Sequence, residues 1–126
     1  MKETQGTENV EPIRKGILYL LLDDAFMLCH VSGALPYDQY PSRTTEQVFD
    51  MARKETLNMA SAGLISVLEC LDPETQHDYV SIPRDHYEEV LLKNENWSVP
   101  SENSTKTFWI ELTSEGEQIL KAMMKA

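Results

Sequence analysis

The tightest constraint on the fold is a predicted strand that runs directly into a predicted helix. Residues 107–112 read Thr-Phe-Trp-Ile-Glu-Leu, and aromatic and β-branched side chains in such a run are typical of a strand. Ser114 to Glu117 then matches a capping box, and Ile119, Leu120 and Met123 follow at the spacing of a buried helix face. The chain therefore needs a sheet for this strand and a core for this helix.

A first helix is expected near the start of the sequence. Pro12 can begin it, because the first turn of a helix needs no backbone N–H there. Apolar residues then recur at helical spacing as far as Leu28, with an expected break near Asp23 and Asp24.

A second helix is expected to run to about Ala62. Thr44 and Gln47 match the capping box that begins it, and Gly63 ends it. Its buried side is expected to consist of Val48, Phe49, Ala52, Thr56, Met59 and Ala60.

Two short segments between these helices and the final strand are expected to be strands. Residues 64–71 and 79–82 are β-prone and are separated by a turn sequence, so they are predicted to form a hairpin. A helix can begin at Pro83, and the polar residues 93–106 are predicted to form a mobile loop. Together these elements predict an α+β fold, mainly helical with a small antiparallel sheet.

The order of these elements resembles that of a winged-helix (winged helix-turn-helix-like) domain. Residues 62–65, Ala-Gly-Leu-Ile, resemble the end of the recognition helix of that fold, and residues 108–116 resemble its second wing strand and closing helix cap. The polar residues 1–11 are expected to be a flexible tail. The resemblance implies one domain over residues 12–126, with an enlarged acidic insertion at about 66–106 between the wing strands.

The resemblance also implies where DNA and a second copy would bind. In winged-helix domains the recognition helix, which corresponds to residues 45–62 here, enters the major groove, and the terminal helices often form a homodimer. The candidate DNA contacts are Arg43, Gln47, Arg53, Lys54, Asn58 and Lys106. Their four cations predict a slope of about −3.6 for log affinity against log salt, at ~0.9 per phosphate contact.

The charge of the chain disfavours DNA as the partner. The net charge is −10, and between Glu69 and Glu102 nine carboxylates face only Arg84 and Lys93. Such a surface repels a phosphate backbone. A protein is therefore the preferred partner, and DNA is the alternative.

Trp97 and Val99 are the candidate contacts to a protein partner. Both lie in the predicted polar loop, where an exposed aromatic side chain can anchor a partner. The alternative is that Trp97 folds back onto the core.

Catalytic and cofactor motifs are absent from the sequence. It contains no Gly-rich phosphate loop, no Cys-x-x-Cys pair and no Gly-x-Ser-x-Gly elbow, so we expect a non-catalytic protein without a cofactor. One metal hypothesis remains, in which His86 and Glu89 at i, i+3 bind with His77 or Asp78 as a third ligand. Pairs at this spacing are common by chance.

The hydropathy pattern excludes a membrane span. The longest apolar run, residues 16–22, is well short of the ~18 residues that a span needs. The polar start does not match a secretory signal, so we expect a cytoplasmic protein. The expected function is a non-catalytic, winged-helix-like regulatory or interaction module, and the alternative is a dimeric DNA-binding transcription regulator.

Overall fold

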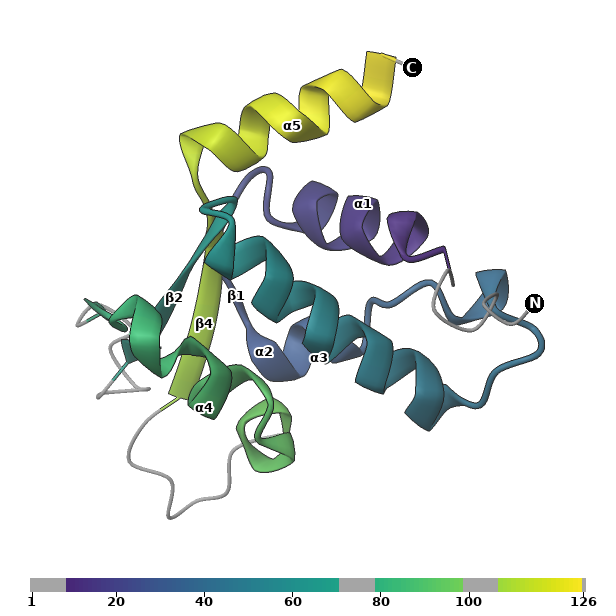
Figure 1. Ribbon diagram of the computed structural model, residues 1–126, viewed down its shortest axis with the longest axis horizontal. Coiled ribbons are helices and arrows are strands. Elements are labelled where there is room, and N and C mark those ends of the chain that lie inside the picture. Colours follow the sequence, from purple (N-terminus) through teal and green to yellow (C-terminus); the bar gives the residue numbers. More distant parts are fainter. Residues whose placement is uncertain (1–8, 71–78, 99–106, 126) are drawn as a thin grey trace.

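The computed structural model describes residues 9–70, 79–98 and 107–125 (Figure 1). Its helices and strands, with the short 3-10 helices labelled η, are α1 (Glu11–Leu20), β1 (Phe26–Met27), α2 (Leu28–Ser32), η2 (Tyr37–Gln39), α3 (Thr45–Ser61), β2 (Ile65–Cys70), β3 (Tyr79–Ser81), η3 (Arg84–His86), α4 (Tyr87–Leu91), η4 (Asn94–Trp97), β4 (Thr107–Leu112) and α5 (Ser114–Lys125).

The described strands form one antiparallel sheet in the order β1-β4-β2-β3. β4 lies beside β2 with Ile65 opposite Leu112, and its other edge pairs Phe26 of β1 with Ile110. The strand predicted over residues 107–112 is β4, and the predicted hairpin is the β2–β3 pair. The α+β prediction, helices with a small antiparallel sheet, is confirmed.

The main core lies between the helices and one face of the sheet (Figure 1). Val67 and Ile110 are fully buried there. Because side chains alternate across a strand, Leu68 and Trp109 point to the opposite face, where they form a smaller apolar cluster with Cys70. The main core also takes in, among others, Ile13, Ile17, Leu28, Val31, Val48, Met59, Ile65 and Leu120.

The start of α5 is bound to the turn between α3 and β2. Gly63 adopts φ = 84°, a left-handed conformation that favours glycine at the end of a helix. The Thr113 hydroxyl donates to the carbonyl oxygen of Gly63 at 2.7 Å and accepts from the Gly116 N–H at 3.0 Å. The helix cap is therefore Thr113. The prediction that Ser114 begins the cap is wrong by one residue, because the Thr113 hydroxyl also hydrogen-bonds the Gly63 carbonyl oxygen in the neighbouring turn.

The first predicted helix is divided in the structure. α1 ends at Leu20, and the chain returns through β1 before α2 begins at Leu28. The sequence predicts the break near Asp23 but not the strand after it. Two residues are too few to show the alternation of a strand, and β1 forms by pairing with β4. Ile119 was also expected in the core, yet 41% of its surface is exposed.

The segment between β3 and residue 98 is ordered against α3. α4 packs on α3, and η4 packs on α2, α4 and β4 (Figure 1). The prediction of a mobile loop from residue 93 onward is wrong for residues 94–97, which form η4. Residues 99–106 lie outside the described part of the chain.

Candidate functional site

The outward side of α3 is the surface on which most of the predicted DNA contacts were expected. The capping box that begins the helix is present, since the Gln47 N–H donates to Thr44 Oγ1 at 3.1 Å and the Thr44 N–H donates to Gln47 Oε1 at 2.9 Å. Val48, Ala52 and Met59 are buried, as the apolar spacing predicted. The side chains left facing solvent on the opposite side include Gln47, Lys54 and Asn58.

Arg53 does not lie on this outward side. Only 14% of its side chain is exposed, because the guanidinium turns toward the segment that contains α4. It donates to the Leu92 carbonyl oxygen at 3.2 Å and to Asn94 Oδ1. Its carbon lies 5.0 Å from the centre of the Phe49 ring, a cation–π arrangement. The prediction of Arg53 as an accessible DNA contact is therefore not met in this arrangement.

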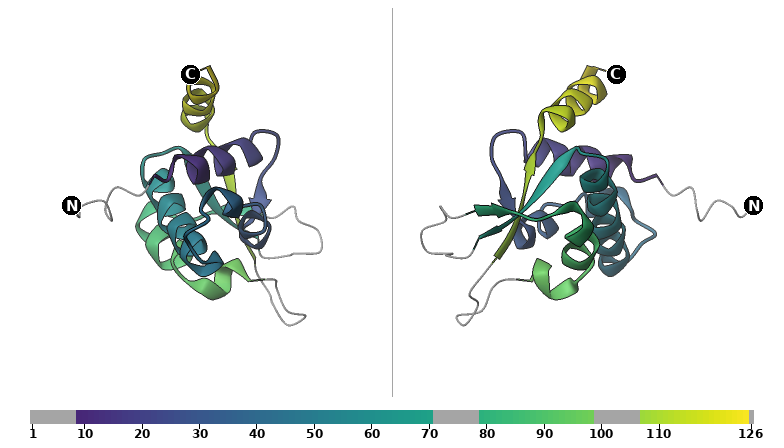
Figure 2. Two further views of the ribbon diagram at one scale, coloured as in Figure 1. Left: turned by 90° about the vertical axis from the view of Figure 1, so that its right-hand side faces the viewer. Right: turned by 60° about the vertical axis from the view of Figure 1, so that its left-hand side comes forward.

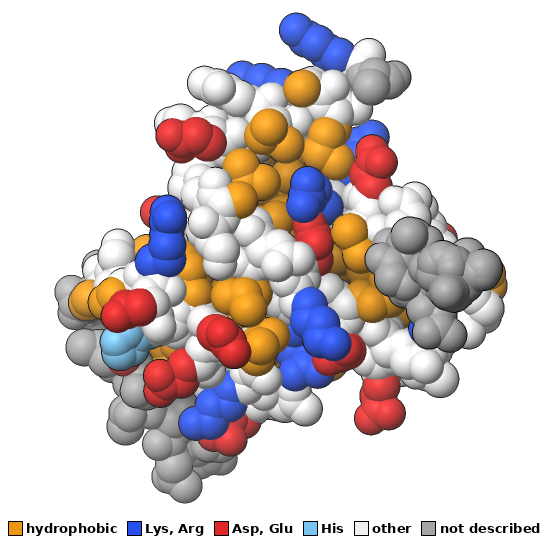
Figure 3. Space-filling model, viewed as in Figure 1, with side chains coloured by type: hydrophobic (Ala, Val, Ile, Leu, Met, Phe, Trp, Pro, Cys, Tyr) orange, Lys and Arg blue, Asp and Glu red, His pale blue; other side chains and the backbone are white. Residues whose placement is uncertain are grey.

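The remaining charge on this part of α3 is balanced within the helix. Asp50 accepts from Arg53 at 2.7 Å and lies 3.0 Å from the Lys54 ammonium. Exposed pairs such as Lys54–Asp50 contribute little stability, but they reduce the local positive potential. Acidic and basic side chains alternate over α3 and α4 on the face that Figure 3 shows, without forming a continuous basic patch.

The other predicted DNA contacts are divided between described and undescribed residues. Arg43 is half-buried in the connection before α3, where its backbone N–H donates to the Tyr40 carbonyl at 3.0 Å. Asn58 donates to Glu55 Oε1 at 3.4 Å. Lys106 lies outside the described residues, as does Val99.

Trp97 belongs to the core, which settles the two alternatives for this residue in favour of packing. It is 3% exposed, and its indole Nε1–H donates to the Leu91 carbonyl oxygen at 2.8 Å. Its ring meets Phe49 edge-on, with 5.5 Å between the ring centres. Trp97 is therefore not an exposed anchor. It joins η4 to the flank of α3 on which Arg53 lies, because both side chains contact the Phe49 ring.

Of the predicted metal ligands, the structure describes His86 and Glu89. His86 Nδ1 lies 4.0 Å from Glu89 Oε1 at the rim of a hollow of about 360 Å³ beside α4. His77 and Asp78 lie outside the described residues. Within the described ranges, no group of three His, Cys, Asp or Glu side chains is placed to bind a metal ion.

Comparison with known proteins finds no match to a family model, to a curated protein or to a solved structure. Among the described helices, none has the length and apolar character that crossing a membrane requires.

Two charged contacts were not predicted from the sequence. Glu55 is 3% exposed and accepts from Arg14 Nε of α1 at 2.5 Å. Asn94 binds the Arg53 side chain across the gap between α3 and the η4 segment. The only local signal was that Glu55 falls near the apolar side of α3, where an unpaired carboxylate would be unfavourable.

Proposed function

We propose that this chain is a non-catalytic, winged-helix-like regulatory module that binds a protein partner. The order helix, strand, two helices, strand, insertion, strand supports a winged-helix-like arrangement. The pairing of β1 with β4, which places the last strand of the chain between β1 and β2, supports it further.

The contact of Arg53 with the insertion is the observation that carries the preference for a protein. This guanidinium is the strongest base-reading and phosphate-binding group on α3, and it is bound to Leu92 and Asn94. Lys54 is the neighbouring cation, and Asp50 lies 3.0 Å from it. A major groove would therefore meet a helix with a net charge of −1, from three carboxylates and two cations between Thr45 and Ser61.

The proposed partner surface combines the outward side of α3 with the exposed side of α4. Lys54 and Asn58 supply polar contacts, and Glu88 and Glu89 on α4 are exposed carboxylates. Such a surface suits a protein with basic side chains at its contact face, since complementary charge accelerates association and selects the partner.

Site-specific photocrosslinking in cells tests the class of partner directly. A photoreactive residue at position 58, on the outward side of α3, is expected to give products that protease destroys and nuclease leaves intact. The matched control is position 34, an exposed residue between α2 and η2 that lines a separate hollow beside α1. Nuclease-sensitive products at position 58 would favour DNA over a protein as the partner. Equal yields at both positions would show that the outward side of α3 is not the partner surface.

DNA binding as a transcription regulator is the second candidate, and one observation favours it. Gln47, Lys54 and Asn58 are exposed together on α3, and amide and ammonium groups can read base edges. Titration of a mixed-sequence duplex at low salt separates the two candidates. We expect no saturable binding below about 10 μM, the range of weak non-specific contacts. Tight, salt-sensitive binding that Lys54→Ala weakens and Arg84→Ala does not would establish the alternative.

We also propose that the module is a homodimer. The exposed apolar side chains at the end of the chain, Ile119 at 41% and Met124 at 51% exposure, support self-association. Sedimentation of the full chain across a range of concentrations tests this part of the proposal.

A further inference from the structure

β3 (Tyr79–Ser81) lies at one edge of the sheet, and all three of its residues are exposed. β2 pairs with its inner side, and no strand of the described chain pairs with its outer side. The right-hand view of Figure 2 brings this side of the molecule forward. An edge strand presents unpaired backbone N–H and C=O groups, to which an extended segment of another chain can bind.

The register with β2 determines which backbone groups of β3 point outward. The Ile82 N–H donates to the Val67 carbonyl oxygen at 2.9 Å, one position beyond the pairing of β3 with β2. Because hydrogen-bonded and non-hydrogen-bonded pairs alternate in an antiparallel ladder, Val80 is the residue of β3 that bonds toward β2. The N–H and C=O groups of Tyr79 and Ser81 therefore point away from β2. Within the described ranges, no backbone group outside β2 is hydrogen-bonded to them.

A hollow of about 360 Å³ lies beside β3, between the sheet and α4. Its lining includes the carboxylates of Glu69, Glu89 and Glu95 and the ammonium of Lys93. Three carboxylates and one ammonium leave an excess of two negative charges. Such a lining attracts a basic side chain of a partner and repels an acidic one.

We propose that an extended, basic segment of the protein partner adds to β3 as a further antiparallel strand of the sheet. The inference rests on the proposed protein partner and names the segment of it that binds. Antiparallel addition continues the pattern of the sheet, because each described pair of strands is antiparallel.

The side of β3 that faces the hollow requires a long basic side chain. Val80 points to the same face as Glu69, with which it pairs, and 53% of the Val80 surface is exposed. Neighbouring strands lie about 4.8 Å apart, so a residue of the added strand beside Val80 lies about 10 Å from Glu69. The apolar stem of a lysine or arginine can pack on Val80 while its charged end reaches the hollow.

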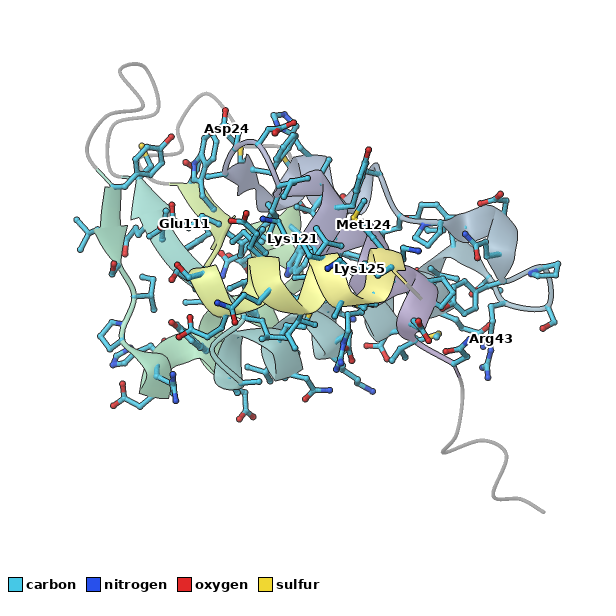
Figure 4. All side chains as sticks on the ribbon, turned by 90° about the horizontal axis from the view of Figure 1, so that it is seen from above. Asp24, Arg43, Glu111, Lys121, Met124 and Lys125 are labelled. Carbon is cyan, nitrogen blue, oxygen red and sulfur yellow. The ribbon has the colours of Figure 1, made fainter. Side chains whose placement is uncertain are left out.

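The opposite side of β3 favours an apolar residue in the segment. Tyr79 is 37% exposed, and its ring meets Trp109 edge-on with 5.4 Å between the ring centres. A β-branched side chain beside Tyr79 would extend this cluster across the edge. Asp24 and Glu111, which Figure 4 labels, line a second hollow with Tyr79, so carboxylates lie on this side too. The segment is therefore expected to alternate basic and apolar residues.

Three peptides test this arrangement by titration, with the backbone amide resonances of the protein as the readout. The probe is Val-Lys-Val-Lys-Val-Lys with blocked ends. In the proposed pairing the valines beside Tyr79 and Ser81 donate to their carbonyl oxygens, whereas the lysine N–H groups point away from the sheet. A peptide methylated on the valine nitrogens lacks these donors, and one methylated on the lysine backbone nitrogens is the matched control.

We expect the probe to bind with a dissociation constant below about 1 mM, the affinity that about four backbone hydrogen bonds supply. The amide resonances of Tyr79 and Ser81 should shift on binding. Methylation of the valines should weaken binding at least about tenfold, because two hydrogen bonds are lost, and methylation of the lysines should weaken it less than about threefold.

Two protein variants test the contribution of the hollow. Glu89→Gln with Glu95→Gln removes two lining carboxylates and should weaken binding of the probe about threefold. Glu46→Gln with Glu115→Gln changes the net charge equally at exposed positions outside the hollow, and should leave the binding unchanged.

Equal binding of the two methylated peptides would overturn the inference, because charge alone would then explain the binding. No binding of the probe below about 1 mM would also overturn it. Crosslinking at position 58 decides the proposed function separately. Protein products there, without binding of the probe, would leave the protein partner and eliminate the β3 edge. An absence of protein products would remove the partner and this inference with it.

Discussion

Replacing Gly116 with alanine tests the junction that joins α5 to the α3–β2 turn. A Cβ atom at this position would lie 2.0 Å from the Leu64 carbonyl oxygen and 2.8 Å from Leu112 Cδ1. Overpacking of this kind costs about 1–3 kcal/mol, and displacing the Thr113 hydroxyl from its 2.9 Å hydrogen bond to the Leu64 carbonyl oxygen adds about 1 kcal/mol. Alanine favours the helix by up to about 1 kcal/mol. The free energy of unfolding should therefore fall by about 2 kcal/mol.

Urea denaturation followed by circular dichroism measures this change. Gly16→Ala is the matched control, because the new Cβ would meet only Pro36 Cδ at 4.0 Å, an ordinary contact. Gly16 lies in the exposed part of α1, so alanine there should raise stability by about 0.5–1 kcal/mol. The two identical chemical changes should therefore have opposite signs.

An unchanged or higher stability in Gly116→Ala would refute this account of the junction. It would mean that α5 does not seat its first turn against the Leu64 carbonyl. A thermal midpoint about 8 °C lower than that of the wild type is the corresponding expectation, at roughly 4 °C per kcal/mol for a domain of this size.

Four further predictions concern stability. Thr44→Ala removes the α3 cap and should lower the unfolding free energy by about 1 kcal/mol in urea, whereas an unchanged midpoint would show that the cap is not formed in solution. Glu55→Gln weakens its contact with Arg14 and should cost about 2 kcal/mol, against a negligible loss if this carboxylate is exposed. Trp97→Ala should cost about 3–5 kcal/mol, and free quenching of its fluorescence by acrylamide would contradict its burial. Burial, with the nearby charges of Cys70 and Asp24, raises the pKa of Tyr79. Since the folded state then holds this proton more tightly, the contribution of Tyr79 to the free energy of unfolding, measured against Tyr79→Phe, should be constant below about pH 9 and fall above about pH 10, and a rise there would be inconsistent.

Local signals in the sequence predicted the elements whose determinants are local. The run of residues 107–112 defines β4, and the Thr44 cap and Gly63 define the ends of α3. In each case a few adjacent residues contain the whole physical reason. The same reasoning explains why the buried side of α3 could be predicted from apolar spacing.

Features that depend on distant partners were missed. β1 consists of two residues that are strand only because β4 lies beside them. Thr113 and Ser114 are equivalent as caps in the sequence, and the contact of Thr113 with Gly63 decides between them. Arg53 has an exposed position by spacing alone, but residues about forty positions later cover it.

A double-mutant cycle between Arg53 and Asn94 tests the central claim, that the insertion binds the cationic side chain of α3. Arg53→Ala, Asn94→Ala and the double variant are compared by urea unfolding. The contact predicts a coupling free energy of about 1–2 kcal/mol between the two sites, the magnitude of a hydrogen bond to a charged group. Strictly additive effects would contradict the claim and leave Arg53 free to face a partner or DNA.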